Sequence, residues 1–576
     1  MSYEITFSIV GSGGDGAVAA GDIVANACAG AGLHVIKTEA YGPQIRGGES
    51  SCTVRISANP IFAQAGAVDA LVVFSWSDFA RFASEITPAN DGIVFYEAED
   101  APPENAAGIL VPVAFSKLAP KSKNILALGF IAPLLALPLD GIRAAIRQRF
   151  SKKTSAVIDA NLAAFDQGIA LLSDVAITSL RRLEYASGAP RLLMSGNEAA
   201  AVGAIHAGCR FFAGYPITPS SEILHLLGEW LPKIGGTSLQ TEDELSAIGA
   251  VVGASFAGAK AMTATSGPGL SLMAEMLGLS SIAEIPSVIF NVQRGGPSTG
   301  IPTKSEQSDL MHAVYASHGD TPRVVLGCCD VDDAFHTTVD AFNISEEFQV
   351  PVIVLSDQLI AQRRETIETS SLVHDVVQRR IAVPSGDGDY RRYLETSDGV
   401  SPMSIPGIAG GMYQTNGLEH DEVGRPNSMF VVHEKMNAKR YRKLDAIAQK
   451  YRLYRKFGSE NPELGILCWG SSSGPVREAL DALNVGDLRV GAFVPRILAP
   501  LPAAEMQAFI NACDQLLIIE LSYSEQFHHY LRSQLDLPRG KTHILARSGG
   551  KSLAVAEVIS SVRQLLGAGE LQEVLA

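Results

Sequence analysis

The sequence predicts an α/β protein built from several three-layer domains, each with a largely parallel sheet. Short apolar segments alternate with glycine-rich turns and with helices of small residues along most of the chain, as in strands joined by helical crossovers. The composition indicates a folded protein, since 47% of the 576 residues are hydrophobic, 19% are charged and 54 are glycine. This length exceeds what a single hydrophobic core supports, so about three or four domains are expected.

Charge and cysteine content exclude several classes of protein. The net charge of -15 is spread without blocks of like charge, which argues against nucleic acid or an anionic membrane as the main partner. The seven cysteines are scattered without a Cys-x-x-Cys pair, so we expect no iron–sulfur or zinc ligand set and no metal site in this chain. Met1–Val10 has no basic residue, unlike a signal peptide, and the apolar run Ile125–Leu139 is too short to span a bilayer. These features favour a cytoplasmic location.

The N-terminal segment places a glycine-rich turn between a strand and a helix. We expect a strand at Ile5–Val10, then Gly11-Ser-Gly-Gly-Asp-Gly16, then a helix at Ala17–Ala31. The next strand, His34–Thr38, leads to Glu39, which stands where dinucleotide-binding domains have an acidic residue for the ribose. The motif is weak when it occurs alone, so nucleotide binding remains one of two readings here.

The residues that follow differ from an ordinary dinucleotide-binding domain. Tyr41-Gly-Pro-Gln-Ile-Arg-Gly-Gly-Glu49 comes next, and then an alternating strand at Ser51–Ser57. Asp15-Gly16 also completes a Gly-Asp-Gly, which binds Mg²⁺ and a diphosphate when an asparagine follows after a helix and a strand. Asn26 is too close for that purpose. We therefore expect no Mg²⁺–diphosphate site in this chain.

The alternation continues to about residue 190. The expected elements are strands at Ala70–Trp76 and Gly92–Tyr96, helices at Gly141–Phe150 and Ser155–Arg182, and a linker at Glu184–Pro190. Asn197 and Glu198 are expected to start the first helix of the next domain.

The most informative stretch is Arg210-Phe-Phe-Ala-Gly-Tyr-Pro-Ile-Thr-Pro-Ser-Ser-Glu222. It predicts a short strand at Phe211–Ala213 and a helix with Thr218 as N-cap and Pro219 at the first helical position. The helix is expected because apolar residues recur at helical spacing: Ile223, Leu224, Leu226, Leu227 and Trp230. A strand, turn and helix in this order place N–H groups and hydroxyls at the carboxyl edge of a sheet, where α/β folds bind ligands. The alternative is that Thr218 and Ser220 only cap a helix.

Two further turns follow expected strands. Glu244, within Thr241-Glu-Asp-Glu-Leu-Ser, precedes a helix of very small residues that a ligand or another backbone can approach closely. Its alternative role is that of a first-turn residue favoured by the helix dipole. Thr263-Ala-Thr-Ser-Gly-Pro-Gly269 ends a strand and opens a helix at Leu270–Leu279, although its hydroxyls can equally be caps.

A second long signature is Ser287-Val-Ile-Phe-Asn-Val-Gln-Arg-Gly-Gly-Pro-Ser-Thr-Gly-Ile-Pro-Thr303. It predicts a strand ending at Arg294 and a loop that carries Thr299 and Thr303. A planar guanidinium binds a carboxylate through two charge-assisted hydrogen bonds, so Arg294 is a candidate for an anionic substrate. The alternative is a structural ion pair.

The rest of the chain alternates again around one long loop. Further strands are expected at Val324–Leu326, Val352–Leu355, Gly465–Trp469, Val490–Phe493 and Leu516–Ile519. Ala382–Asn427 is expected to be a loop, in which Glu419, His420 and Asp421 are too close in sequence to converge on one ion and are expected to form hydrogen bonds instead.

A basic helix is expected after this loop, at Lys435–Lys456, with its charges on a solvated face or on a face that docks a partner. His528 and His529 are expected at the surface.

Several of these motifs resemble those of one enzyme family. Tyr215-Pro-Ile-Thr-Pro-Ser-Ser-Glu222 is similar to the hallmark of the α subunit of 2-oxoacid:ferredoxin oxidoreductases, which use thiamine diphosphate. Thr265-Ser-Gly-Pro-Gly269, the segment from Arg294 to Thr303 and Gly417-Leu-Glu-His420 resemble further family motifs in the same order. The Tyr41–Glu49 region resembles the γ domain of the family. The chain thus resembles a fused γα subunit, most like that of 2-oxoglutarate:ferredoxin oxidoreductases.

The resemblance implies roles for single residues. It assigns Glu244 to the carboxylate that contacts N1′ of the aminopyrimidine, with Glu242 as the next candidate. The residues implied for substrate binding are Arg294, Thr218, Thr299 and Thr303. The residues implied for coenzyme binding are Tyr215, Pro216, Ile217, Thr218, Glu244, Ser266 and Gly267. Arg46, Gly47 and Gly48 are candidates for coenzyme A binding or for closing the site, and the alternative for Arg46 is a tether to a carboxylate.

The resemblance also implies domains and partners. The expected domains are a Rossmann-like γ domain at 1–190, a thiamine-diphosphate pyrimidine-binding domain at 191–370, a linker loop with the basic helix at 371–456, and a transketolase C-terminal-like domain at 457–576. The implied partners are ferredoxin and a β subunit that holds the pyrophosphate, Mg²⁺ and a [4Fe–4S] cluster, in a dimer of αβ heterodimers.

The implied reaction is the oxidative decarboxylation of 2-oxoglutarate with coenzyme A as co-substrate, and pyruvate is the alternative acid. Two other classes remain open: a nucleotide-binding regulatory protein on a degenerate thiamine fold, and an NAD-linked dehydrogenase.

Overall fold

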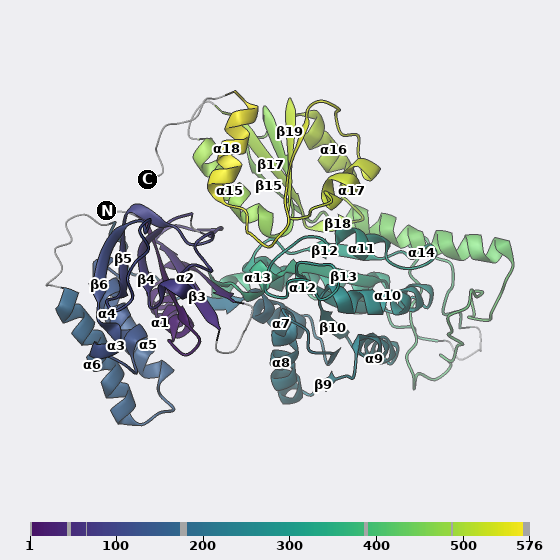
Figure 1. Cartoon of the computed structure of the whole chain (residues 1–576). Helices are drawn as coiled ribbons and strands as arrows, with labels where there is room; N and C mark the ends of the chain where they lie inside the picture. Colours follow the sequence, from purple (N-terminus) through teal and green to yellow (C-terminus); the bar gives the residue numbers. More distant parts are fainter. Residues whose placement is uncertain are drawn as a thin grey trace. The chain divides into compact units, whose positions relative to one another are not determined.

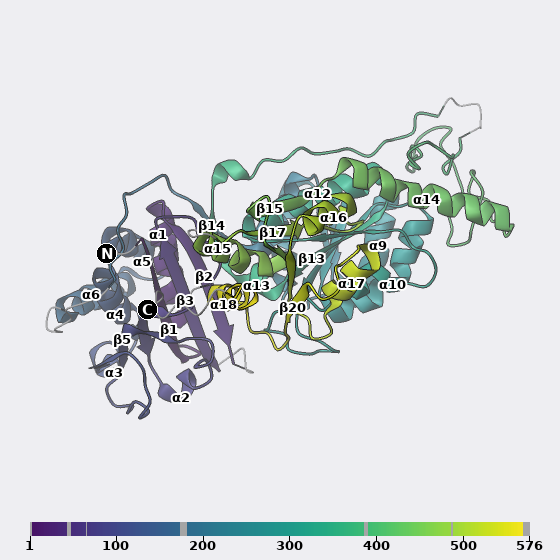
Figure 2. The same ribbon diagram turned by 90° about the horizontal axis from the view of Figure 1, so that it is seen from above.

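The computed structural model describes residues 3–42, 48–64, 66–172, 181–384, 390–484 and 488–567, which form three sheets and their covering helices (Figures 1 and 2). The chain divides into two compact units. The first unit comprises Met1–Ser195, Gln362–Ser371 and Leu553–Ala576, and the second comprises Gly196–Ala361 and Leu372–Ser552.

The first unit contains an eight-stranded mixed sheet with the order β6-β5-β4-β1-β3-β2-β14-β7. Its strands are β1 (Glu4–Ser12), β2 (His34–Tyr41), β3 (Glu49–Ser57), β4 (Val68–Val73), β5 (Pro88–Glu97), β6 (Ile109–Val113), β7 (Leu192–Ser195) and β14 (Arg364–Ile367). β1, β4, β5 and β6 are parallel neighbours, whereas β3 runs antiparallel between β1 and β2. At the other end of the sheet, β14 pairs antiparallel with β2 and with the edge strand β7.

This topology differs from that of a dinucleotide-binding domain, in which the first two strands are adjacent and parallel. Glu39 is not available to a ribose, because Lys37 and Tyr41 both bond its carboxylate. The glycine-rich turn is occupied by its own acid: the Ser12 N–H donates to Asp15 Oδ2 at 2.9 Å, and Lys123 pairs with Asp15 at 2.7 Å. The contacts of the turn are therefore structural, and they do not support the prediction that Glu39 binds the ribose of a nucleotide.

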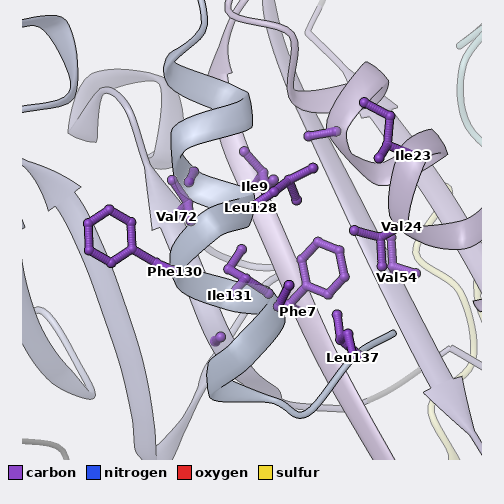
Figure 3. Packing of buried hydrophobic residues seen from close by; sticks show 14 of the residues in the cluster. Phe7, Ile9, Ile23, Val24, Val54, Val72, Leu128, Phe130, Ile131 and Leu137 are labelled. Carbon is purple, nitrogen blue, oxygen red and sulfur yellow. The ribbon is translucent and has the colours of Figure 1, made fainter. Parts of the chain in front are cut away.

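Five helices of the first unit bury a continuous apolar core. They are α1 (Ala17–Gly30), α3 (Phe115–Leu118), α4 (Lys123–Leu134), α5 (Leu139–Arg149) and α6 (Ser155–Leu172). The unit also contains α2 (Trp76–Phe79), which packs in a smaller apolar cluster, and α18 (Val555–Leu565). Figure 3 shows Phe7 and Ile9 of β1 against Leu128 and Ile131 of α4. The apolar run that begins at Ile125 is thus a buried helix, and no described helix is long and apolar enough to cross a membrane.

The end of β4 was predicted too late. The strand ends at Val73 rather than Trp76, because the Ser75 hydroxyl accepts the Asp78 N–H and starts α2.

The second unit contains a seven-stranded sheet with the order β18-β12-β13-β11-β10-β8-β9. Its strands are β8 (Phe211–Gly214), β9 (Thr237–Gln240), β10 (Ala261–Thr265), β11 (Ser287–Gln293), β12 (Val324–Gly327), β13 (Pro351–Asp357) and β18 (Ile497–Ala499). All neighbours are parallel except β18, which pairs antiparallel with β12. Its helices are α7 (Gly196–His206), α8 (Ser221–Trp230), α9 (Glu244–Phe256), α10 (Gly267–Ile282), α11 (Leu310–Tyr315), α12 (Val331–Phe348), α13 (Gln358–Gln362) and α14 (Phe430–Lys450).

The same unit contains a five-stranded sheet with the order β15-β17-β16-β19-β20. Its elements are β15 (Tyr454–Gly458), β16 (Leu464–Leu467), β17 (Val490–Pro495), β19 (Gln515–Glu520), β20 (Thr542–Ala546), α15 (Ser473–Leu483), α16 (Ala503–Asn511) and α17 (Gln526–Gln534). Helix α15 lies on one face of this sheet and α16 and α17 on the other (Figures 1 and 2). Trp469 and Phe493 share one apolar cluster with Val325 and Leu310 of the seven-stranded part. The strands expected here are confirmed, and His529 is exposed as predicted, but His528 is buried.

The start of α8 was predicted two residues too early. The helix begins at Ser221 with Ser220 as its N-cap residue, so Thr218 is not the cap. The reason is a separate turn: both the backbone N–H and the hydroxyl of Ser220 donate to the Ile217 carbonyl at 2.9 Å. Thr218 and Pro219 are the middle of that turn, which leaves the Thr218 side chain outside the helix.

The prediction that the charges of the basic helix α14 lie on a solvated or docking face is wrong for two of its lysines, whereas Lys435 and Lys450 are exposed. Lys439 and Lys443 are at most 1% exposed, and both bind Glu284, with Nζ to carboxylate oxygen distances of 2.7 and 2.6 Å. Arg392 donates to the Glu284 backbone carbonyl at 2.6 Å. We call Glu284, Arg392, Lys439 and Lys443 the Glu284 cluster. It joins α14 and the long loop to the connection between α10 and β11.

The long loop before α14 is held by side-chain hydrogen bonds, as predicted. Residues 382–384 and 390–427 form no helix or strand. Glu419 pairs with Arg440 of α14 at 2.7 Å and with His433 at 2.6 Å. His420 lies against the Tyr393 ring, with ring centroids 4.0 Å apart.

Replacing Glu284 by glutamine is expected to destabilise the protein by about 3–5 kcal/mol, because three buried cations then face no anion. The measurement is the midpoint of thermal or denaturant unfolding, with Glu275→Gln on the exposed face of α10 as the matched control. An unchanged midpoint for Glu284→Gln would show that the cluster contributes nothing to stability.

Lys443 is expected to make stability depend on pH. Burial, reinforced by Lys439, lowers the pKa of Lys443 to about 7, although Glu284 opposes the shift. Between that pH and the ordinary lysine pKa of about 10.4, the unfolded chain binds a proton that the folded protein lacks, so stability rises with pH. Well below pH 7 both states carry the proton and this contribution is constant.

The difference in unfolding free energy between wild type and Lys443→Met is therefore expected to grow in favour of wild type from pH 7 to pH 9, by up to about 1.4 kcal/mol per pH unit. Lys450→Met, an exposed position on the same helix, is the control. A difference that does not change with pH would contradict the assignment.

Candidate functional site

Four of the sequence motifs begin where four adjacent parallel strands end, at the same edge of the seven-stranded sheet. β11, β10, β8 and β9 are neighbours in that order. Their carboxyl ends lead into the turns that begin at Arg294, Ser266, Tyr215 and Thr241, respectively. Because the strands are parallel, these turns emerge side by side, where open α/β sheets bind ligands.

Arg294 and the turn of the first motif are in direct contact. Arg294 is 7% exposed, and its guanidinium donates from Nη1 to the backbone carbonyl of Thr218. From the other side, Asn197 Nδ2 donates to the Pro219 carbonyl at 3.0 Å. Burial lowers the pKa of Arg294, and the charge of Asp309 opposes that shift. No described carboxylate forms an ion pair with Arg294, so the structural ion pair considered from the sequence is absent from the described residues.

Glu244 lies against the turn that starts α10. Its side chain is 5% exposed at the first position of α9, which Asp243 caps by accepting the Ser246 N–H at 2.7 Å. A Cβ atom at Gly269 would stand 2.6 Å from Glu244 Oε1, so only glycine allows the carboxylate to lie there. In the part of the chain that the structure describes, the Glu244 carboxylate has no hydrogen-bond or ion-pair partner.

The buried edge also carries polar atoms without partners. Ser266 Oγ, Asn291 Oδ1 and Arg294 Nε are buried and make no hydrogen bond within the described residues. Burying a polar group without a partner costs free energy, so a polar ligand bound at this edge would be stabilised by these atoms. With the Glu244 carboxylate, they form a donor and acceptor set that fits a polar heterocycle and an anionic substrate.

Asn291, which the sequence did not single out, contacts Asp309 at this edge, and Asp309 was a less certain candidate in the motif that begins at Arg294. Asn291 Nδ2 donates to Asp309 Oδ2 at 2.8 Å, and the Asp309 N–H donates to Gln293 Oε1 at 3.1 Å. Both Asp309 oxygens lie 3.3 Å from where a Cβ on Gly267 would stand. Burial raises the pKa of Asp309, although the bond from Asn291 opposes this. The available signal for Asn291 was a polar residue within the otherwise apolar stretch Val288–Val292 of β11.

The other residues predicted for the site are more exposed or have no contact with Arg294 among the described residues. Tyr215 is exposed, Pro216, Ile217 and Thr303 are half-buried, and Thr299 is exposed in the loop after Arg294. Among described residues, no contact brings Thr299 or Thr303 to Arg294. Arg46 and Gly47 lie outside the described residues. Gly48 belongs to the first unit, where its carbonyl accepts the Gly13 N–H at 2.7 Å.

Three family models match the chain. "Pyruvate flavodoxin/ferredoxin oxidoreductase, thiamine diP-bdg" matches residues 202–439, which include all four motifs of this edge. "Pyruvate ferredoxin/flavodoxin oxidoreductase" matches residues 6–171, and "Pyruvate:ferredoxin oxidoreductase core domain II" matches residues 463–558.

Curated relatives cover part or all of the chain. The 2-oxoglutarate synthase subunit KorA of Archaeoglobus fulgidus is 41% identical over 330 residues, which are 57% of this chain and 88% of the relative. Its counterpart in Methanothermobacter marburgensis is 36% identical over 64% of this chain and 97% of the relative. The 2-oxoacid:ferredoxin oxidoreductase subunit alpha of a Sulfolobus species is 29% identical over 99% of this chain and 98% of its own length.

One solved structure matches nearly the whole chain. The 2-oxoglutarate:ferredoxin oxidoreductase from Magnetococcus marinus, with 2-oxoglutarate, coenzyme A and succinyl-CoA bound, superposes with a TM-score of 0.93 at 35% sequence identity, over 98% of this chain and 100% of that one. The family expected from the motifs is confirmed, and the chain belongs to the 2-oxoacid:ferredoxin oxidoreductases, as a subunit that joins the γ-type and α-type parts.

Proposed function

We propose that this chain forms the γα part of an enzyme that converts 2-oxoglutarate and coenzyme A to succinyl-CoA and carbon dioxide, with transfer of two electrons to ferredoxin. The names of the KorA relatives and the ligands of the Magnetococcus marinus enzyme support 2-oxoglutarate as the acid. The observation that carries the proposal is the shared sheet edge, where a buried carboxylate, Glu244, follows β9 and a buried arginine, Arg294, follows β11 of the same parallel sheet.

Thiamine diphosphate would supply the carbanion-stabilising chemistry that breaks the bond between the carboxylate and the carbonyl carbon of the acid. Glu244 would hold a proton at N1′ of the aminopyrimidine, a role that suits a buried carboxylate without another partner. Ser266 and Gly267 would approach the coenzyme at the start of α10, and the half-buried Pro216 and Ile217 with Tyr215 would form an apolar wall beside it.

Arg294 would bind the substrate carboxylate. Nη1 donates to the Thr218 carbonyl, which fixes the plane of the guanidinium, and Nε has no partner among the described residues. A pre-oriented guanidinium binds a carboxylate with little further loss of side-chain entropy. The hydroxyls of Thr218, Thr299 and Thr303 would bind the remaining oxygens of the acid. Pyruvate shares the 2-oxo acid group, so it is the alternative substrate.

The remaining parts of the active enzyme would come from a partner. We propose a β subunit that holds the pyrophosphate, Mg²⁺ and a [4Fe–4S] cluster, in a cytoplasmic dimer of αβ heterodimers. Arg46, Gly47 and Gly48 of the γ part would contact coenzyme A or close over the site.

The first experiment is an anaerobic viologen-reduction assay of the chain purified with its partner. Reduction with 2-oxoglutarate that requires coenzyme A, at a kcat/KM well above that for pyruvate, supports the proposal. A preference for pyruvate replaces the substrate assignment. Failure with every 2-oxoacid, in a complex that contains thiamine diphosphate and iron, would refute it.

Glu244→Gln is expected to lower kcat by about 100-fold or more, because the neutral amide cannot hold the proton at N1′. The thiamine diphosphate content of the purified complex shows whether the coenzyme still binds. Glu242→Gln, an exposed position two residues earlier, is the control and is expected to keep wild-type kcat. Wild-type turnover in Glu244→Gln would remove Glu244 from catalysis.

Arg294→Lys is expected to raise KM for the 2-oxoacid by about 10- to 100-fold, since a lysine keeps the charge but loses the paired hydrogen bonds. The KM for coenzyme A is expected to change little, which separates loss of substrate contact from general damage. Arg452→Lys, at an exposed position, is the control. Equal increases in both KM values would mean that Arg294 supports the fold of the site rather than the acid.

A further inference from the structure

Three potential metal ligands come from one turn at the start of α17. Glu525 immediately precedes the helix in a left-handed conformation, with φ of 53°, and His528 and His529 follow in the first turn. His528 and His529 are three and four positions after Glu525, a spacing that brings side chains together on one face of a helix. His528 Nδ1 lies 3.1 Å from Glu525 Oε2, and the two imidazole rings are stacked with centroids 5.2 Å apart.

The ligand atoms of this turn are close enough to bind one ion. One atom from each of Glu525, His528 and His529 lies within 4.8 Å of the other two. Two imidazole nitrogens with one carboxylate oxygen suit zinc and similar transition metals, whereas Mg²⁺ and Ca²⁺ prefer oxygen ligands. We propose that Glu525, His528 and His529 form a binding site for a divalent transition metal ion of the zinc type.

The surroundings of this turn favour a bound cation. Glu520 ends β19 behind the turn, is 1% exposed and accepts the backbone N–H groups of Phe527 and His528, both at 2.9 Å. The carboxylates of Glu520 and Glu525 offset the partial positive charge of the helix start, which otherwise disfavours a cation.

The three ligand residues differ in their exposure to solvent. His528 is buried and therefore held in place, whereas His529 is exposed and Glu525 is half-buried. Three protein ligands leave a coordination position for water or another ligand, as in zinc sites that exchange ligands. The site is thus expected to take up metal from solution without rearrangement of the core.

The same turn is fastened to the segment that follows the loop carrying Thr299 and Thr303. Gln526 Nε2 donates to the Ser308 carbonyl at 2.7 Å, and its Oε1 accepts the Met311 N–H at 3.0 Å. Metal binding at Glu525 would therefore stabilise the contact between α17 and residues 308–311, which include Asp309.

The test is a calorimetric titration of the purified complex with Zn²⁺, after treatment with a chelator. Wild type, His529→Gln, Glu525→Gln and the control His225→Gln, an exposed histidine on α8, are compared. Sites on the partner are common to all four proteins and cancel in the comparison. Wild type and His225→Gln are expected to bind one more Zn²⁺ per γα chain than His529→Gln, or to bind it at least about tenfold more tightly.

A second readout is thermal unfolding with and without Zn²⁺. The metal is expected to raise the unfolding midpoint of wild type and of His225→Gln but not of His529→Gln or Glu525→Gln. Because His529 is exposed, its replacement is expected to leave the midpoint of the metal-free protein unchanged. Identical titrations and midpoints in wild type and both ligand variants would overturn the site.

Discussion

The Glu284 cluster is the constraint on which the arrangement of the candidate site depends. Glu284 lies in the connection between α10 and β11. Helix α10 begins at the site with the Ser266–Gly269 turn, and β11 ends there just before Arg294. Lys439, Lys443 and Arg392 bind this connection from α14 and from the long loop. One buried anion thus binds two lysines of α14 and lies beside Arg392 of the long loop, and both segments are far from it in the sequence. Although burial alone would raise the pKa of Glu284, the two lysines hold it below its usual range.

The opposite end of the sheet shows how one topology gathers a site from separate motifs. Each motif is a turn after a strand, and parallel pairing brings the four turns to one edge. Contacts between turns then set the details: Arg294 bonds the Thr218 carbonyl, and Gly269 makes room for Glu244. The site therefore needs few dedicated interactions, because the sheet supplies the proximity and the glycine supplies the space.

Much of this fold could be predicted from the sequence, since buried parallel strands such as Ser287–Gln293 are continuous apolar runs that end in glycine or polar residues. The errors have specific causes. Lys439 and Lys443 were expected in solvent because a helix pattern does not show an anion about 155 positions away. Thr218 was expected to cap a helix because local rules do not reveal that Ile217 and Ser220 close their own turn. The insertion of β3 between β1 and β2 is a long-range pairing, which no local pattern records. At the site, Asn291 was missed because its contact with Asp309, 18 positions away, is not visible in the sequence.

The pairing of β18 with β12 has a consequence for how this subunit can be divided. β18 comes from the C-terminal part of the chain, yet it forms the outermost strand of the seven-stranded sheet. A truncated protein that ends before Ile497 would leave the apolar strand Val324–Gly327 as an open edge, a template for pairing with other chains. A fragment that contains the seven-stranded sheet without β18 is therefore expected to self-associate, whereas fragments that keep β18 retain its pairing with the edge of β12.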